Sequence, residues 1–189
     1  FDTPLEVPFI THWLHNMTHD QVLDMLKYLG MSNHPEDKVK VIFVPCYLNG
    51  RDGILNKDYY DLLLGQDLSV YPSYYEPWGY TPLESVAFRV PTITTDLAGF
   101  GLWVKSLKKQ NGIDGGVEVL HRSDYNYSEV ADGIKDTVSL FSAKTENEVK
   151  EIRKHAAEIA EKALWKHFIK YYYEAYDIAL RNAMKRQLN

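Results

Sequence analysis

The sequence has little cysteine, no long apolar run and no block of basic residues, and each scarcity argues against a class of protein. The one cysteine, Cys46, cannot form an internal disulfide and is typical of a reducing compartment, so we expect a cytoplasmic protein. No apolar segment approaches the length that spans a bilayer, so we expect no membrane partner. The formal net charge is -5 and basic residues come at most in pairs such as Lys108-Lys109, so we expect no nucleic-acid partner.

The composition is that of an ordinary globular domain. Of the 189 residues, 45% are hydrophobic and 25% are charged, which is enough for one domain with a sizeable core. We therefore predict a single, partial domain over residues 1–189, with a helical segment from about 128 to 189. Aromatic residues reach 13%, including 14 tyrosines, a content found where carbohydrates or nucleotides are bound but also in packed cores.

Strand and helix patterns alternate along most of the chain. The β-branched and aromatic run 39–44 predicts a strand buried on both faces. Further strands are expected over 68–71, 92–95 and 116–120, with a short helix at 57–64 between the first two. Such alternation predicts an α/β fold, a Rossmann-like parallel sheet with flanking helices and right-handed crossovers, followed by C-terminal helices.

Three capping boxes predict where helices begin. A capping box pairs a Ser or Thr N-cap with a Glu or Gln three residues later. The boxes are Thr18-x-x-Gln21, Thr81-x-x-Glu84 and Thr145-x-x-Glu148. A last helix is expected from Trp165 to Met184.

The most informative segment is the run from Tyr71 to Glu84, YPSYYEPWGYTPLE. Two carboxylates, Glu76 and Glu84, bracket an aromatic turn that contains Gly79 and opens into a helix. Pro82 suits the first helical position, with Thr81 as the N-cap. A helix start of this kind presents free N–H groups and the positive end of the helix dipole, where phosphate is the usual occupant. Because the turn follows a predicted strand, it lies where open α/β sheets bind ligands.

The two glutamates of this run, and several residues outside it, also have ordinary structural interpretations. Glu84 suits a role as capping partner of Thr81, worth about 1 kcal/mol. Glu76 in a loop suits a solvated charge, and Tyr59 on a short helix suits a half-buried packing residue. Gly99 and Gly101 suit simple turn glycines. Cys46 suits a small buried hydrophobic residue.

The sequence of this run resembles the donor-site motif of retaining glycosyltransferases of the GT-B fold, in which two glutamates are separated by seven residues. It resembles glycogen synthases of the animal and fungal type most specifically. The resemblance extends over most of the chain through further segments: Thr11-His12, His15-Asn16-Met17, 37–43, 90–96, Gly99-Phe100-Gly101 and Leu164-Trp165-Lys166. It implies the C-terminal, nucleotide-sugar-binding domain of a GT-B enzyme, in part.

The resemblance also implies roles for individual residues. Glu76 is the implied catalytic residue, close to the reacting carbon of the donor sugar, as a nucleophile or as an electrostatic support. Glu84 is implied to accept hydrogen bonds from the ribose, and Tyr59 to stack on the base. The implied backbone contacts to sugar and phosphates come from Trp78, Gly79, Tyr80 and Thr81.

The implied substrates are UDP-glucose or ADP-glucose and an α-1,4-glucan acceptor, with no cofactor and no metal. His12, His15 and His19 do not have the spacing of a zinc site, and no cluster of cysteines or carboxylates accompanies them in the sequence. The glucan is expected to bind through the missing N-terminal domain, and a homo-oligomer of the parent protein is left open.

The resemblance covers only the latter part of these enzymes, so we interpret the chain as part of a longer protein and expect it to be inactive alone. The arginine and lysine that hold the pyrophosphate in this family precede the region, and Arg51 and Arg89 are the nearest candidates here. Two alternatives stay open: a non-catalytic homologue that binds nucleotide sugar, and a GT-B transferase with a non-glucan acceptor.

Overall fold

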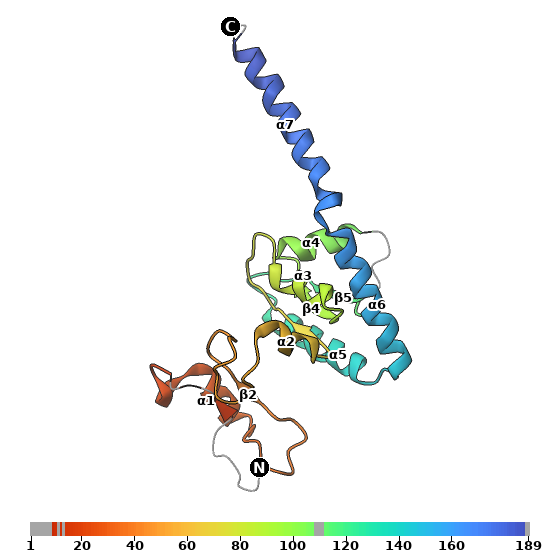
Figure 1. Ribbon diagram of the computed structural model, residues 1–189. Coiled ribbons are helices and arrows are strands. Elements are labelled where there is room, and N and C mark those ends of the chain that lie inside the picture. The colour runs from red at the N-terminus through yellow and green to blue at the C-terminus, as the bar shows by residue number, and fades with distance from the viewer. Residues whose placement is uncertain (1–8, 11, 13, 108–111, 188–189) are drawn as a thin grey trace. The chain divides into compact units, whose positions relative to one another are not determined.

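The chain divides into two units, Phe1–Leu62 and Leu63–Asn189, which are described separately (Figure 1). The computed structural model describes residues 9–10, 12, 14–107 and 112–187. The first unit contains a parallel pair of short strands and two helices. These are β1 (Phe9–Ile10), the 3-10 helix η1 (Met17–His19), α1 (Gln21–Tyr28) and β2 (Ile42–Phe43). Helix α2 (Tyr59–Leu64) spans the boundary between the units.

The first unit departs from the sequence prediction at three places. Asp20 caps α1 by accepting hydrogen bonds from two backbone N–H groups at 3.0 Å, so the predicted Thr18 box is wrong; an adjacent carboxylate is the better N-cap acceptor. Strand β2 has two residues, and Ile42 is 48% exposed, because the sheet of this unit has no strand beyond β1 and β2 in the described ranges. Cys46 is exposed, not buried.

The second unit is built on a three-stranded parallel sheet. Its strands are β3 (Ser69–Val70), β4 (Thr92–Thr95) and β5 (Val117–Leu120), in the order β3-β4-β5. All four residues of the central strand β4 are buried. The predicted α/β fold with a parallel sheet is therefore confirmed, and the three strands lie where the hydrophobic runs place them.

Helices cover both faces of this sheet (Figure 1). They are α3 (Tyr80–Ala87), α4 (Gly99–Ser106), α5 (Tyr127–Ser142) and α6 (Glu146–Lys162). Helix α7 (Trp165–Gln187) follows α6 and is exposed from Lys170 to Arg186. Val117 and Val119 of β5 pack with buried residues of α3, α4 and α6 in the main core. Leu120 faces the other way and lies against Gly133 of α5. The two-residue period of a strand thus sends alternate side chains to the two layers.

The capping boxes of this unit have different outcomes. The Thr145 box is confirmed, since the backbone N–H of Thr145 donates to Glu148 and the N–H of Glu148 donates to the Thr145 hydroxyl. The Thr81 box is wrong, because the N-cap of α3 is Gly79 and the helix begins at Tyr80. Gly79 has φ +104, a left-handed backbone that glycine adopts without strain, and it brings the chain directly into the helix. Thr81 is therefore already inside α3, and Pro82 is its third residue.

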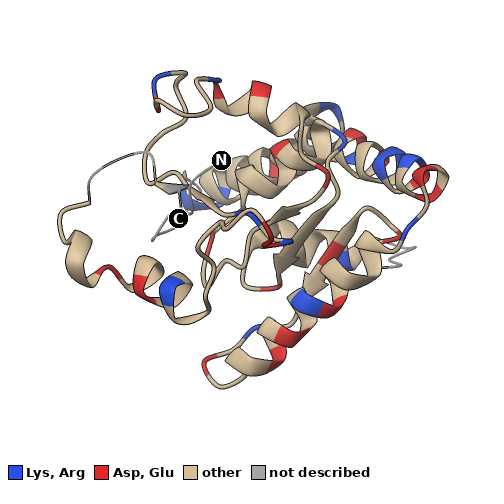
Figure 2. Cartoon of the chain, turned by 90° about the horizontal axis from the view of Figure 1, so that it is seen from below, with Lys and Arg blue, Asp and Glu red and all other residues tan. Residues whose placement is uncertain are grey.

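Arg153 joins helix α6 to the loops that precede β3 and β4. The guanidinium of Arg153 donates to Asp67 at 3.0 Å, to the carbonyl of Gln66 at 2.8 Å and to the carbonyl of Arg89 at 3.4 Å. Acidic and basic residues are interspersed along the outer helices (Figure 2). In the part of the chain that the structure describes, no helix combines the length and apolar character needed to cross a bilayer.

Candidate active site

The backbone at Glu76 is fixed to the end of the central strand. Glu76 follows β3 and forms a single parallel bridge with Ala98, just beyond β4. Its N–H donates to the carbonyl of Leu97 and its carbonyl accepts from the N–H of Gly99, both at 3.1 Å. The half-buried side chain accepts a hydrogen bond from the hydroxyl of Ser73 at 3.3 Å. The carboxylate therefore stands at the carboxyl end of the sheet with its main chain held on both sides.

The turn after Glu76, residues 76–79 and here called the motif turn, lies directly against the start of α4. The carbonyl of Trp78 accepts a hydrogen bond from the N–H of Phe100 at 2.5 Å. A Cβ at Gly99 would lie 2.2 Å from the carbonyl oxygen of Pro77, and a Cβ at Gly79 would lie 3.2 Å from Pro82. Gly99 therefore allows a backbone-to-backbone approach that no other residue type permits, whereas Gly79 is required mainly for its left-handed backbone.

The other glycine of the Gly-Phe-Gly segment has the same purpose. A Cβ at Gly101 would lie 2.1 Å from the carbonyl oxygen of Thr95, at the end of β4. Neither glycine of this segment is a simple turn glycine, because both lie within α4. They let α4 lie close against the strand end and the motif turn.

The side chain of Trp78 belongs to an aromatic cluster. It meets Phe100 and Phe168 edge to face, with ring centres 6.1 and 5.8 Å apart, and Trp103 at 5.9 Å in a tilted arrangement. Phe168 belongs to α7, so the first turn of α7 is packed on the motif turn. A cavity of about 340 Å³ beside it is lined by aromatic and apolar side chains: Trp78, Tyr80, Leu83, Ala163, Trp165, Phe168 and Tyr172. The side chain of Trp78 is therefore engaged in packing between the motif turn, α4 and α7.

The structure brings six of the seven predicted site residues to one turn and the helix that follows it. Glu76, Trp78 and Gly79 belong to the turn, and Tyr80, Thr81 and Glu84 lie in α3. Tyr80 is 69% exposed, and Glu84 is half-buried.

The seventh predicted site residue, Tyr59, is the first residue of α2 and belongs to the other unit. It is half-buried, with its ring centre 5.2 Å from that of Tyr60. Its predicted stacking role stays a prediction.

Arg89 does not suit the role of a pyrophosphate ligand. It follows Phe88, the C-cap of α3, in a left-handed conformation with φ +62, and it comes before β4. It therefore lies at the amino end of the sheet, whereas the motif turn follows the carboxyl end of β3. Its carbonyl is also engaged by Arg153 of α6.

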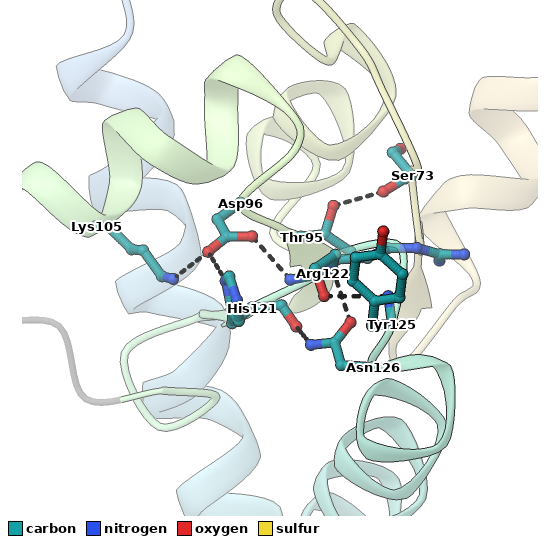
Figure 3. A network of polar contacts seen from close by, with 9 residues as sticks. Ser73, Thr95, Asp96, Lys105, His121, Arg122, Tyr125 and Asn126 are labelled. Atoms are coloured by element: carbon teal, nitrogen blue, oxygen red, sulfur yellow. Dashed lines mark hydrogen bonds and ion pairs between the residues drawn. The ribbon is translucent and has the colours of Figure 1, made fainter.

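A polar network that the sequence analysis did not find lies at the carboxyl ends of β4 and β5 and contacts Ser73, three residues before Glu76 (Figure 3). Asp96 follows β4, and its carboxylate accepts from Lys105 at 2.9 Å and from the N–H of Arg122 at 2.9 Å. His121 Nδ1 lies 2.8 Å from the same carboxylate. The Thr95 hydroxyl donates to the carbonyl of Ser73 at 2.6 Å. The sequence did contain a signal for this network: Thr95, Asp96 and Arg122 end or follow neighbouring parallel strands, whose carboxyl ends lie at one edge of the sheet.

The carboxyl group of Asp96 has a strongly lowered pKa. Burial, with 13% of the side chain exposed, favours the neutral form, but hydrogen bonds from Lys105, from the Arg122 N–H and from His121 outweigh it. The pKa falls from 3.8 to about 2. Because the folded-state pKa is the lower one, the network contributes its full stability above the unfolded value and loses it as the pH falls toward 2.

We expect Asp96→Asn to remove an acid-sensitive part of the stability. The shift corresponds to roughly 2 kcal/mol, and the exposure of Lys105 and His121 reduces this to about 1 kcal/mol through solvent screening. Urea unfolding at pH 6 and pH 3 measures it: the wild-type free energy of unfolding should fall by about 1 kcal/mol more than that of the variant. Parallel losses in the two proteins would contradict the prediction.

Comparison with known proteins supports the sequence resemblance. The family model described as glycogen synthase matches residues 4–189. The chain is 32% identical over 182 residues to a glycogen [starch] synthase of Neurospora crassa, covering 96% of this chain and 26% of that protein. It is 34% identical over 181 residues to isoform 2 of Saccharomyces cerevisiae, covering 95% and 26%. It is 41% identical over 98 residues to the liver enzyme of Mus musculus, covering 52% and 14%. The chain thus spans about a quarter of the length of its fungal relatives.

Proposed function

This chain belongs to the glycogen synthase family, and from that premise we propose that it is the donor-binding part of a retaining glucosyltransferase. The parent protein, meaning the longer protein that contains the chain, transfers glucose from UDP-glucose or ADP-glucose to the end of an α-1,4-glucan. The single observation that supports this best is the placement of Glu76. Its backbone is bound on both sides at the carboxyl end of a parallel sheet, where ligands bind in folds of this kind.

The proposed chemistry follows from what surrounds that carboxylate. Loss of the nucleoside diphosphate leaves positive charge on the anomeric carbon, and the Glu76 carboxylate stabilises it, either through space or by forming a bond. The diphosphate gains negative charge as it leaves. The backbone N–H groups and positive dipole end at the start of α3, at Tyr80 and Thr81, suit that charge.

Two further assignments rest on the family resemblance. Glu84 lies one helical turn beyond Tyr80 and is proposed to accept the ribose hydroxyls, while Tyr59 stacks on the base. Any base offers a π-face to such a tyrosine, so the choice between UDP and ADP stays open.

The proposal requires no metal. Helix dipoles and cations are proposed to neutralise the diphosphate instead.

The glucan acceptor is proposed to bind through the N-terminal domain of the parent protein. The arginine and lysine that hold the pyrophosphate are proposed to lie in that part of the parent as well, and we place the parent in the cytoplasm. Homo-oligomerisation of the parent remains a prediction.

We expect the parent protein to elongate a short malto-oligosaccharide with one of the two donors. Incubation with UDP-glucose and with ADP-glucose, following nucleotide release and chain length, names the donor. The chain of residues 1–189 alone is the control, and it should give no transfer. Donor binding without elongation would overturn the proposal, in favour of a non-catalytic homologue or of a transferase with another acceptor.

A further inference from the structure

We propose that Arg122 is a positioning residue that holds the segment 72–76 and, through it, the Glu76 carboxylate. Arg122 follows β5, far from Glu76 in the sequence, and none of the residues assigned above includes it. The inference rests on the proposed function, because it assigns Arg122 a part in the same reaction.

The guanidinium of Arg122 contacts two residues of this segment. Its Nη1 donates to the carbonyl of Pro72 at 2.6 Å, and its Cζ lies 5.3 Å from the centre of the Tyr74 ring. A carbonyl acceptor combined with an aromatic face suits the planar guanidinium, which forms hydrogen bonds in its plane and stacks above it. A lysine at this position would keep the charge and lose the combination.

The residue between these two contacts completes the connection to the carboxylate. The carbonyl of Ser73 accepts from the buried Thr95 hydroxyl at 2.6 Å, and the Ser73 hydroxyl donates to Glu76 at 3.3 Å. The segment is thus held at Pro72 by Arg122, at Ser73 by Thr95, and at Glu76 by the backbone beyond β4. Without the first of these, the segment is still held at Ser73 and Glu76, but Pro72 and Tyr74 lose their contact with the guanidinium, so the residues before the carboxylate are less well ordered.

The backbone of Arg122 is itself fixed by hydrogen bonds (Figure 3). Its N–H donates to Asp96, and the loop around it is closed by Asn126. The Asn126 side chain accepts from the N–H of Ser123 at 2.7 Å and donates to the carbonyl of His121 at 2.9 Å. Arg122 therefore extends from a fixed backbone, which is what a positioning residue requires.

A positioning role and a ligand role predict different kinetics. Removing a residue that only orients Glu76 lowers kcat and does not change the affinity for the donor, because the donor diphosphate binds at the start of α3. A residue that binds the donor phosphates weakens donor binding when it is removed. Since a misplacement of about 1 Å costs on the order of 100-fold in rate, we expect a fall in kcat between about 10-fold and 100-fold.

The test compares Arg122→Ala, Arg122→Lys and Arg153→Ala in the parent protein. Arg153 is the matched control, because it too donates to backbone carbonyls but does so from α6, to residues outside the segment. For Arg122→Ala we expect the lowered kcat, a donor Kd within about twofold of wild type, and partial recovery of kcat on adding millimolar guanidinium. The kcat of Arg122→Lys should lie between those of Arg122→Ala and wild type. Arg153→Ala should keep the wild-type kcat and show no change on adding guanidinium.

Hydrogen exchange of the amides of residues 73–78 provides a measurement that does not need turnover. We expect faster exchange there in Arg122→Ala than in wild type, and no change in Arg153→Ala. A donor Kd that weakens as much as kcat falls, a kcat like that of wild type, or unchanged exchange would each overturn the inference. Absence of transfer in the wild-type parent would overturn the proposed function instead, and the exchange result would still decide the ordering role of Arg122.

Discussion

Glu76→Gln in the parent protein is expected to lower kcat for glucosyl transfer about a thousandfold, with donor binding largely kept. Glutamine has nearly the same volume and can still accept the hydrogen bond from Ser73, so the motif turn keeps its contacts. What disappears is the negative charge opposite the developing positive charge on the sugar. Because that charge exists only in the transition state, the loss falls on kcat rather than on donor affinity.

Initial rates at saturating donor and a donor titration by calorimetry separate the two effects. Glu118→Gln is the matched control: Glu118 is a half-buried carboxylate on β5 that accepts a hydrogen bond from the N–H of Ile113 at 3.2 Å, outside the motif turn. It should leave kcat within about twofold of wild type, because it lacks contact with the reacting groups. A Glu76→Gln enzyme that retains a tenth or more of the wild-type rate would identify Glu76 as a solvated loop charge, the ordinary interpretation of its sequence position.

The local parts of this site could be predicted from sequence because each depends on a few neighbouring residues. The strand 92–95 and the Thr145 capping box are examples, since a buried β-branched run and a Thr-x-x-Glu pair carry their own structural signal. The same reasoning failed at α3, where the sequence contains the capping pattern but Thr81 is not the N-cap of the helix. The left-handed backbone of Gly79 starts the helix earlier, and no pattern of side chains reveals the φ of a glycine.

The polar network around Asp96 and Arg122 could not be predicted for a different reason. Asp96 and Arg122 are 26 residues apart, and the Arg122 contact to Pro72 spans 50. They meet only because β3, β4 and β5 are neighbours and parallel, which brings their carboxyl ends to one edge. The sequence predicts that such an edge exists, but the side chains that pair there depend on strand order and register.

The Gly99→Ala variant should both destabilise the protein and impair transfer, because the added methyl group has nowhere to go. Its Cβ would lie 2.2 Å from the Pro77 carbonyl oxygen and 3.2 Å from the Trp78 Cα, both main-chain atoms that cannot rotate away. The motif turn must then move off α4, and the hydrogen bonds that Gly99 and Phe100 donate to its carbonyls lengthen or break. Overpacking together with weakened buried hydrogen bonds is expected to cost about 3 kcal/mol.

The effect on transfer follows from the same displacement, since Glu76 moves with the turn. A shift of about 1 Å lowers the rate on the order of 100-fold. Gly133→Ala is the matched control, a helical glycine whose added Cβ would lie 2.9 Å from the end of the Leu120 side chain, which can rotate. It should change the free energy of unfolding by less than about 1 kcal/mol, because alanine also favours the helix, and leave transfer intact. Thermal unfolding and initial rates on both variants measure this, and equal behaviour of the two would show that the approach of α4 to the motif turn does not constrain the site.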